Sequence, residues 1–264
     1  MILEIQHETR LTYSQPVAEW LSELRLEPLS DANQSCQTFS LTVTGNPQFF
    51  RYMDGFGNRV HHFNLMNPAL ELQALAASVV ETHPQTIDWG TSRSTWPLNP
   101  EQYCIECMDF LRPGGPITQT TRLIPVLKMV EPKEGMRIVD FISTVSAYIH
   151  NSFIYAKAVT GASSPIEHVL EQGKGVCQDF AHLMIALLRS FGVPARYISG
   201  YIHRPNQESQ SHAWCEAWVP DMGWLGIDPT NNLPPNDHFV KVAVGRNFTD
   251  VPPIRGFIAG SARK

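Results

Sequence analysis

The spacing of hydrophobic residues changes about a third of the way along the chain. Up to about Val80, apolar residues fall in short runs of the kind that strands show, and turn residues such as Gly45-Asn46-Pro47 separate them. The runs are ILEIQHETRLTY, SELRLEPL, QTFSLTVTG, QFFRYMD and RVHHFNLM. Short strands at this spacing are typical of an antiparallel β-sandwich or barrel. We therefore predict an all-β domain over residues 1–85.

A stretch without any hydrophobic period follows this region. Residues 86–100 lie within ETHPQTIDWGTSRSTWPLNP, which is rich in Thr, Ser and Pro and carries neither a strand period nor a helix period. Such a composition is typical of a linker between domains, and we assign residues 86–100 to one.

After the linker the hydrophobic period becomes that of helices. In GMRIVDFISTVSAYIHNSF, the apolar positions between Ile138 and Ile149 lie on one stripe of an amphipathic helix. The strongest helical period runs from Cys177 to Phe191 and ends where Gly192 and Pro194 stop a helix. Shorter helices are predicted over residues 102–111 and 165–171. Strands are predicted in ARYISGYIH, SHAWCEAWV and GWLGID and around residues 239–244. This mixture predicts an α+β domain over residues 101–264.

Cys177 stands at the start of the strongest predicted helix, in QGKGVCQDFAHLMIALL. The partial positive charge of a helix N-terminus favours a thiolate, and its N–H groups could hold an oxyanion once the sulfur attacks a carbonyl. Gly173 and Gly175 permit a close approach of the backbone just before the helix. The position alone leaves open the alternative of a buried structural cysteine.

A thiol nucleophile needs a base, and the two strands after the helix offer one. His212 starts SHAWCEAWV, and Asp228 ends GWLGID. A loop of three residues between these strands would place Asp228 opposite Trp214 and diagonal to His212, within reach of a hydrogen bond. A loop of two or four residues would put the two side chains on opposite faces. His182 lies about 140° around the helix from Cys177, so we expect it to be a packing or capping residue.

The segments GVCQDFAHL, SHAWCEAW and GWLGIDPT, in this order and with GVPARYISGY after the first, resemble the transglutaminase-like superfamily of papain-fold thiol enzymes. The resemblance covers about residues 100–250 and implies a core in which a helix packs on an antiparallel sheet. The N-terminal region, with its YMDGFGNRV stretch, resembles the non-catalytic domain that precedes the core in bacterial members. The family also leads us to expect another alternating apolar strand near the C-terminus. No such pattern follows Val251, so we predict that the core lacks its last strand.

The resemblance implies a role for each member of the constellation. Cys177 would be the nucleophile, His212 the general base and acid, and Asp228 the group that orients the imidazole. Related enzymes hold the oxyanion with the nucleophile's own N–H and a neighbouring aromatic or amide side chain, for which Tyr155 and Gln172 are the candidates here.

Two further residues near this constellation have open roles. Asp179 is either an anion favoured by the helix dipole or a contact for a substrate amine or for Arg196. Trp214 either lines a substrate tunnel or belongs to the core.

Composition excludes several other classes of function. The chain is 43% hydrophobic and 17% charged, which excludes disorder. The 25 acidic and 20 basic side chains give a net charge of −5 without long runs, so no nucleic-acid partner is predicted. No apolar window reaches about 18 residues, so no membrane partner is predicted either. Glu4, Glu8 and Arg10 interrupt the segment where a signal peptide would be apolar, and we expect a cytoplasmic, reducing location.

The remaining cysteines and the possible metal ligands give weaker signals. Five cysteines are an odd number and cannot close a complete disulfide framework. We expect Cys36, Cys104, Cys107 and Cys215 to be packing residues, because the CxxC pair has no second pair to complete a zinc site. A metal site built from Cys177, Asp179, His182 and His212 is disfavoured, since the helix separates the first and third of these. We predict neither a metal nor another cofactor.

These observations leave several functions to compare. The first hypothesis is a cysteine peptidase or amidase that hydrolyses a peptide or protein amide through a thioester. Transamidation with an amine acceptor shares every step up to that thioester, so the sequence does not separate the two. A non-enzymatic module that binds peptide or protein on the same fold is a third hypothesis, and a metal-dependent hydrolase a fourth. The sequence leaves the oligomeric state open.

Overall fold

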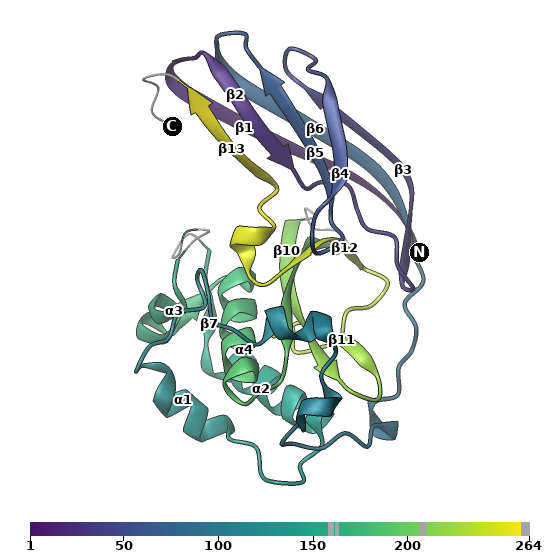
Figure 1. Cartoon of the computed structure of the whole chain (residues 1–264), viewed down its shortest axis with the longest axis vertical. Helices are drawn as coiled ribbons and strands as arrows, with labels where there is room; N and C mark the ends of the chain where they lie inside the picture. Colours follow the sequence, from purple (N-terminus) through teal and green to yellow (C-terminus); the bar gives the residue numbers. More distant parts are fainter. Residues whose placement is uncertain (158–160, 162–163, 206–209, 260–264) are drawn as a thin grey trace. The chain divides into compact units, whose positions relative to one another are not determined.

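The computed structural model describes residues 1–157, 161, 164–205 and 210–259 (Figure 1). The chain forms two compact units. The first comprises Met1–Gln85, Asp237–Ala243 and Val251–Lys264, and the second comprises Thr86–Asn236 and Val244–Asp250. Among the described residues, no helix has the length and apolar character needed to cross a bilayer.

The first unit is a β-sandwich, as predicted. Its strands are β1 (Ile2–Val17), β2 (Glu19–Leu24), β3 (Gln34–Val43), β4 (Phe49–Met53), β5 (Arg59–Leu65), β6 (Ala69–Thr82) and β13 (Ile254–Ala259). They form one sheet in the order β1-β6-β3 and another in the order β13-β2-β5-β4. Trp20 and Phe63 from one sheet and Leu72 from the other are almost fully buried in a shared core. The alternating residues of both sheets therefore interdigitate, which is the packing of a sandwich.

The C-terminal segment corrects one prediction. Residues after Val251 do form a strand, β13, but it pairs antiparallel with β2 in the sheet of the first unit. Ile254 and Ile258 lie two pleats apart and pack against the core of the sandwich, whereas Phe257 between them is exposed. The second unit consequently differs from the predicted domain over residues 101–264, because two C-terminal segments belong to the first unit.

The second unit combines helices with an antiparallel sheet. Its helices are α1 (Leu123–Val130), α2 (Ile138–Ser152), α3 (Ile166–Gln172) and α4 (Cys177–Ser190), with 3₁₀ turns η1 (Trp89–Thr91), η2 (Pro100–Gln102), η3 (Ile105–Phe110) and η4 (Phe248–Asp250). Its strands are β7 (Ile154–Tyr155), β8 (Lys174–Gly175), β9 (Ala195–Ile202), β10 (Gln210–Val219) and β11 (Gly223–Ile227). The sheet order is β11-β10-β9-β12, and the residues of β12 (Phe239–Gly245) are shared between the two units. The short strands β7 and β8 pair parallel with each other.

Helix α4 is the central helix of this unit. Every residue from Asp179 to Arg189 is buried, so the helix is enclosed on all sides. A helix can be enclosed in this way only when its polar side chains find partners. Arg189 does so by donating to the carbonyl groups of Arg112, Ala195 and Arg246.

The linker prediction and one of the two short-helix predictions need correction, whereas the helix predicted over residues 165–171 is confirmed as α3. Residues 86–100 belong to the second unit, where Ser92 and Ser94 donate hydrogen bonds to Asp221. The expected helix over 102–111 consists of 3₁₀ turns. Helix α1 was not predicted because Pro125 falls inside its sequence, although proline is tolerated in the first turn of a helix.

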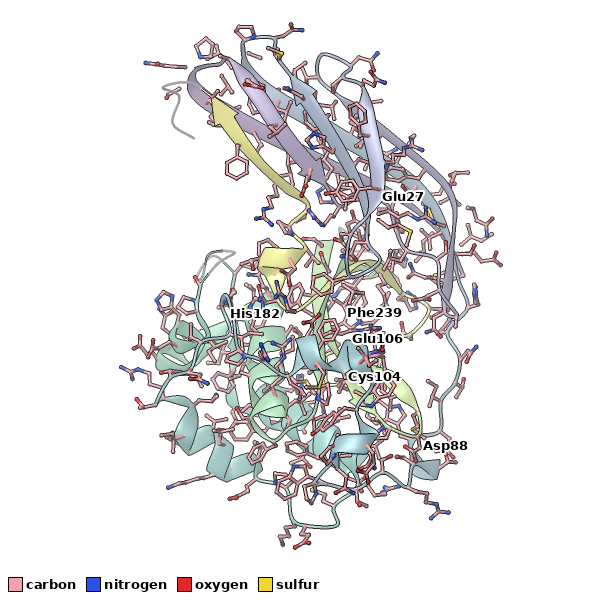
Figure 2. The ribbon with its side chains drawn as sticks, viewed as in Figure 1. Glu27, Asp88, Cys104, Glu106, His182 and Phe239 are labelled. Atoms are coloured by element: carbon pink, nitrogen blue, oxygen red, sulfur yellow. A yellow bond between two sulfur atoms is a disulfide. The ribbon has the colours of Figure 1, made fainter. Side chains whose placement is uncertain are left out.

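The CxxC pair is a disulfide and not merely a packing pair. Cys104 precedes the 3₁₀ turn η3, and Cys107 lies within it. This turn brings their Cα atoms to 5.1 Å, within the range that a disulfide requires, and the two sulfurs are bonded (Figure 2). The expectation of four packing cysteines is therefore wrong for this pair, and Cys36, Cys177 and Cys215 remain as free thiols.

Candidate active site

The backbone before α4 places Cys177 at the first position of the helix. Val176 is extended at the N-cap, and its N–H donates to the Asp179 carboxylate over 2.8 Å. A Cβ atom on Gly175 would lie 2.9 Å from the side chain of Asp179, so only glycine fits there. Gly173, with φ of 64°, ends α3 just before this segment. Cys177 is thus partly exposed at a helix N-terminus, where backbone N–H groups lack intrahelical acceptors.

The hairpin of β10 and β11 brings His212 to Asp228. Val219 pairs with Gly223, so the loop has three residues, which is the length that the sequence argument required. His212 Nε2 lies 2.7 Å from Asp228 Oδ2, and both side chains are buried. The ring also shares a hydrogen bond with Cys177, so the imidazole lies between the sulfur and the carboxylate.

These contacts set the charge of His212. Burial on its own lowers the pKa of an imidazole, but hydrogen bonds to Asp228 and Cys177, together with their charges, outweigh it and raise the pKa of His212 to about 9. The site therefore favours an imidazolium at neutral pH. A positive ring beside the sulfur stabilises the thiolate that a thiol nucleophile needs.

Asp228 is held by residues that the sequence argument missed. It is fully buried, and its Oδ1 accepts the N–H of Thr230 over 2.9 Å. Its Oδ2 accepts the side-chain amide of Asn231 as well as the His212 ring. An aspartate that caps the N–H two residues ahead is an Asx turn, so the segment DPTN carried a readable signal for the first of these contacts.

The two predicted oxyanion candidates have different surroundings. Tyr155 lies on β7 directly opposite Gly175, two residues before Cys177, and the centroid of its ring lies 6.4 Å from that of Phe180. Burial raises the pKa of Tyr155, and the charge of Cys177 adds to the increase. Gln172 is exposed at the end of α3, and the described contacts do not join it to Cys177.

Trp214 and Asp179 take structural positions in the site. Trp214 is buried, and its ring lies nearly parallel to that of His212, with 6.3 Å between the centroids. Asp179 caps the N-terminus of α4 as described above. Arg196 forms an ion pair with Glu216 at 2.6 Å, and a contact between Asp179 and a substrate amine stays a prediction.

His182 lies inside α4 and is separate from the constellation around Cys177. Its Nε2 accepts the N–H of Phe248 over 3.1 Å, and its ring stacks on Tyr197 with 4.9 Å between centroids. The capping and packing role expected from the helical spacing is therefore confirmed. Within the part of the chain that the structure describes, no group of three or more His, Cys, Asp or Glu residues could hold a metal ion.

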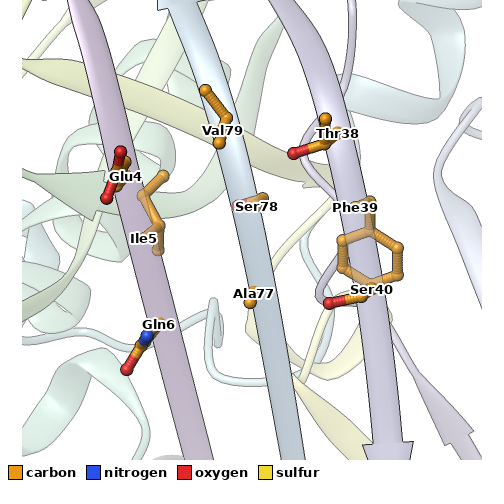
Figure 3. Close-up of a pocket in the computed structure, with 9 residues that line it drawn as sticks. All are labelled: Glu4, Ile5, Gln6, Thr38, Phe39, Ser40, Ala77, Ser78 and Val79. Carbon is orange, nitrogen blue, oxygen red and sulfur yellow. The ribbon is translucent and has the colours of Figure 1, made fainter.

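A cavity of about 490 Å³ lies on the three-stranded sheet of the first unit (Figure 3). Ile5, Ser78 and Phe39 stand next to one another across β1, β6 and β3 in its lining. All of its lining residues belong to the first unit, whereas Cys177 and His212 belong to the second. The cavity is therefore not formed by the constellation described above.

Comparison with known proteins identifies the family. The model of the transglutaminase-like superfamily matches residues 128–229, and that of the bacterial transglutaminase-like N-terminal region matches residues 3–81. An uncharacterised protein of Mycobacterium leprae is 33% identical over 266 residues, which cover 98% of this chain and 93% of that protein. The chain belongs to the transglutaminase-like superfamily. Cys177, His212 and Asp228 all lie within the superfamily match.

Two other similar proteins are named for different activities. A crystal structure of a protein from Cytophaga hutchinsonii, provisionally assigned as a cysteine protease, has a TM-score of 0.80 at 24% identity and covers 99% of this chain and 90% of that one. This likeness shows the shared fold. The protein-glutamine gamma-glutamyltransferase of Pseudomonas aeruginosa is 32% identical over 101 residues, which cover 33% of this chain and 14% of that enzyme.

Proposed function

We propose that the protein is a thiol enzyme that cleaves an amide bond by acyl transfer to Cys177, and that water is the usual acceptor. The observation that carries the proposal is the His212 imidazole, buried between the Cys177 sulfur and the Asp228 carboxylate. A ring in this position can take a proton from one side of the reaction and return it on the other.

The reaction proceeds in two halves. The Cys177 thiolate attacks the carbonyl carbon, and the N–H groups at the start of α4 stabilise the negative oxygen that forms. His212 donates its proton to the nitrogen of the leaving amine, the C–N bond breaks, and a thioester remains on the sulfur. A water molecule then attacks the thioester while His212 accepts its proton. The C–S bond breaks, the carboxylic acid leaves, and the thiolate–imidazolium pair of Cys177 and His212 is restored.

Transamidation differs only in the second half, where an amine attacks in place of water. Water reaches a partly exposed thioester without a dedicated subsite, whereas an amine must compete with a solvent that is always present. We therefore favour hydrolysis of a peptide or protein amide. The two outcomes give products of different mass from one acyl-enzyme.

The experiment that tests the proposal is intact-mass spectrometry of the protein after incubation with a library of peptides and simple amides, with and without an added primary amine. We expect an acyl adduct on Cys177, a free acid as the product without amine, and turnover that disappears in Cys177→Ser. Cys36→Ser is the matched control, because Cys36 is another free, partly exposed thiol. An undiminished rate in Cys177→Ser would contradict the proposal, and an amide product with the added amine would favour transamidation.

A further inference from the structure

We infer that Asn231 is a positioning residue for Asp228, and that the turn Asp228–Leu233 is fixed by α2 so that this carboxylate stays aimed at His212. The inference deepens the proposed function and rests on it. It concerns a residue that acts through Asp228 and does not itself touch the reacting atoms.

Three hydrogen-bond donors hold the carboxylate of Asp228. Thr230 N–H donates to Oδ1 over 2.9 Å. Oδ2 receives the Asn231 amide over 2.5 Å and the His212 ring over 2.7 Å. Because two of these donors belong to the same turn as Asp228, the carboxylate cannot rotate toward the ring or away from it without losing a hydrogen bond. Removing a hydrogen-bond donor from a fully buried carboxylate destabilises the folded protein, because the acceptor is left unsatisfied.

The orientation of the Asn231 amide follows from its other neighbour. Arg204 Nη2 donates to Asn231 Oδ1 over 3.3 Å. A guanidinium only donates hydrogen bonds, and a carboxylate only accepts them. The amide oxygen therefore faces Arg204 and the amide nitrogen faces Asp228, since the flipped arrangement would put two acceptors together and two donors together.

Helix α2 holds the turn at two points one helical turn apart. The buried Ser146 hydroxyl donates to Asn232 Oδ1 over 2.8 Å, and His150 Nδ1 lies 2.9 Å from the carbonyl oxygen of Thr230. Asn232 adopts a φ of 53°, a conformation that asparagine tolerates better than most residues. Asp228 and Leu233 close the turn with backbone hydrogen bonds of 2.9 and 3.3 Å. The position of Asp228 is thus tied to a helix, not to a loop alone.

The test follows the alkylation of Cys177 by iodoacetate as a function of pH, with the modified peptide quantified by mass spectrometry. Iodoacetate is an anion, so the thiolate reacts fastest while the neighbouring imidazolium keeps its charge. The wild-type rate should therefore fall as pH rises through about 9, the pKa of His212. This readout needs no knowledge of the substrate.

Two substitutions of Asn231 should shift the pH at which the alkylation rate of Cys177 falls, and they should shift it in opposite directions. Asn231→Ala loosens the hydrogen bond that holds the imidazolium, so the fall should move to lower pH by about one unit, with a rate at pH 8 about 3- to 10-fold below wild type. Asn231→Asp keeps the size of the side chain but adds a negative charge beside Asp228, so the fall should move to higher pH. Asn151→Ala, at an exposed asparagine of α2, is the matched control and should match wild type.

The outcomes separate this inference from the proposed function. If wild-type Cys177 reacts no faster than Cys36 and shows no fall near pH 9, both are overturned. If wild type shows the fall and both variants keep it at the wild-type pH, the positioning role of Asn231 is overturned and the proposed function stands. The added charge of Asn231→Asp would move the fall whether or not Asn231 positions Asp228, because a carboxylate only accepts hydrogen bonds and cannot replace the donated one. Asn231→Leu keeps the approximate size of the side chain and adds no charge, so it decides the question if Asn231→Ala does not fold: a fall at the wild-type pH in Asn231→Leu overturns the positioning role.

Discussion

Two buried histidines of the second unit differ in pKa by several units. His212 is 6% exposed and has a pKa of about 9, whereas His182 is 0% exposed and has a pKa of about 3. Burial favours the neutral ring in both cases. The difference comes from the neighbours: His212 faces the Asp228 carboxylate and the Cys177 sulfur, whereas Arg189 and the donated N–H of Phe248 disfavour a proton on His182.

This comparison shows which feature makes a buried polar residue a candidate for chemistry. Both rings are enclosed and each makes at least one hydrogen bond, so burial alone does not separate a reactive position from a structural one. What distinguishes His212 is the Asp228 carboxylate on one side of its ring and the Cys177 sulfur on the other. The predictions below change one side of the comparison at a time.

The largest effect should come from removing the ring that carries the charge. His212→Ala removes both the imidazolium beside the sulfur and the proton donor for the leaving group, so amide turnover should fall about 10⁴-fold or more. The measurement is kcat/KM on the amide found in the library experiment. Activity within 10-fold of wild type would show that the ring is not the acid and base of the reaction.

A smaller but still large effect should come from Asp228→Asn. The carboxamide keeps the shape of the residue but no longer stabilises the imidazolium, so turnover should fall about 10²- to 10⁴-fold. The alkaline limb of the pH–rate profile, where kcat/KM falls as His212 loses its proton, should move to lower pH. A pH–rate profile of kcat/KM measures both. A lower rate with an unmoved limb would mean that Asp228 acts only in packing.

Gly175→Ala tests the backbone that positions Cys177. The new methyl group would lie 2.9 Å from the Asp179 side chain, which should cost about 1–3 kcal/mol of the free energy of unfolding. Gly114→Ala is the matched control, because a methyl group there meets nothing within 4 Å. Urea denaturation of both variants gives the comparison, and equal stabilities would contradict the close approach at Gly175.

His182→Leu changes the structural histidine alone. It leaves the N–H of Phe248 without its acceptor, so the free energy of unfolding should fall by about 1–3 kcal/mol while kcat/KM stays within a few-fold of wild type. Thermal denaturation and an activity assay measure the two quantities. A loss of turnover like that of His212→Ala would remove the distinction between the two rings.

The dependence of stability on pH should have opposite signs for the two kinds of histidine. His182, whose pKa burial and Arg189 lower to about 3, binds a proton more readily when unfolded, so stability should fall as pH drops below about 6.5. His212 binds its proton more tightly when folded, so its contribution is present below about pH 6.5 and is lost as pH rises to about 9. Each histidine adds a slope of at most about 1.4 kcal/mol per pH unit. Urea denaturation between pH 4 and 9 should show both slopes in wild type and a weaker acid slope in His182→Leu.

Local sequence patterns predicted much of the second unit. The 3.6-residue period and its stop at Gly192 specify α4, and the helix start explains why Cys177 is distinguished from the other cysteines. The position of Asp228 relative to His212 followed from strand alternation once the loop length was given. These predictions succeeded because each depends on contacts between neighbouring elements.

Contacts between distant residues were not predictable in this way. The pairing of β13 with β2 joins segments that lie far apart in the sequence, and the apolar alternation of β13 is too short to predict it. Asn231 lies in a polar turn whose side chains could all face solvent, and only the fold shows that one of them faces a buried carboxylate. The disulfide depended on a 3₁₀ turn where an α-helix was expected.

The most direct test of the account is an NMR titration of the histidine rings in protein labelled with ¹⁵N at the imidazole nitrogens, with His212→Ala and His182→Leu used for assignment. We expect the His212 ring to remain protonated at pH 7.5 and to titrate near pH 9, and the His182 ring to stay neutral throughout the range from pH 5 to 10. A His212 ring that is neutral at pH 7.5 would contradict the account, because no imidazolium would then stand beside Cys177 to donate a proton to the leaving amine.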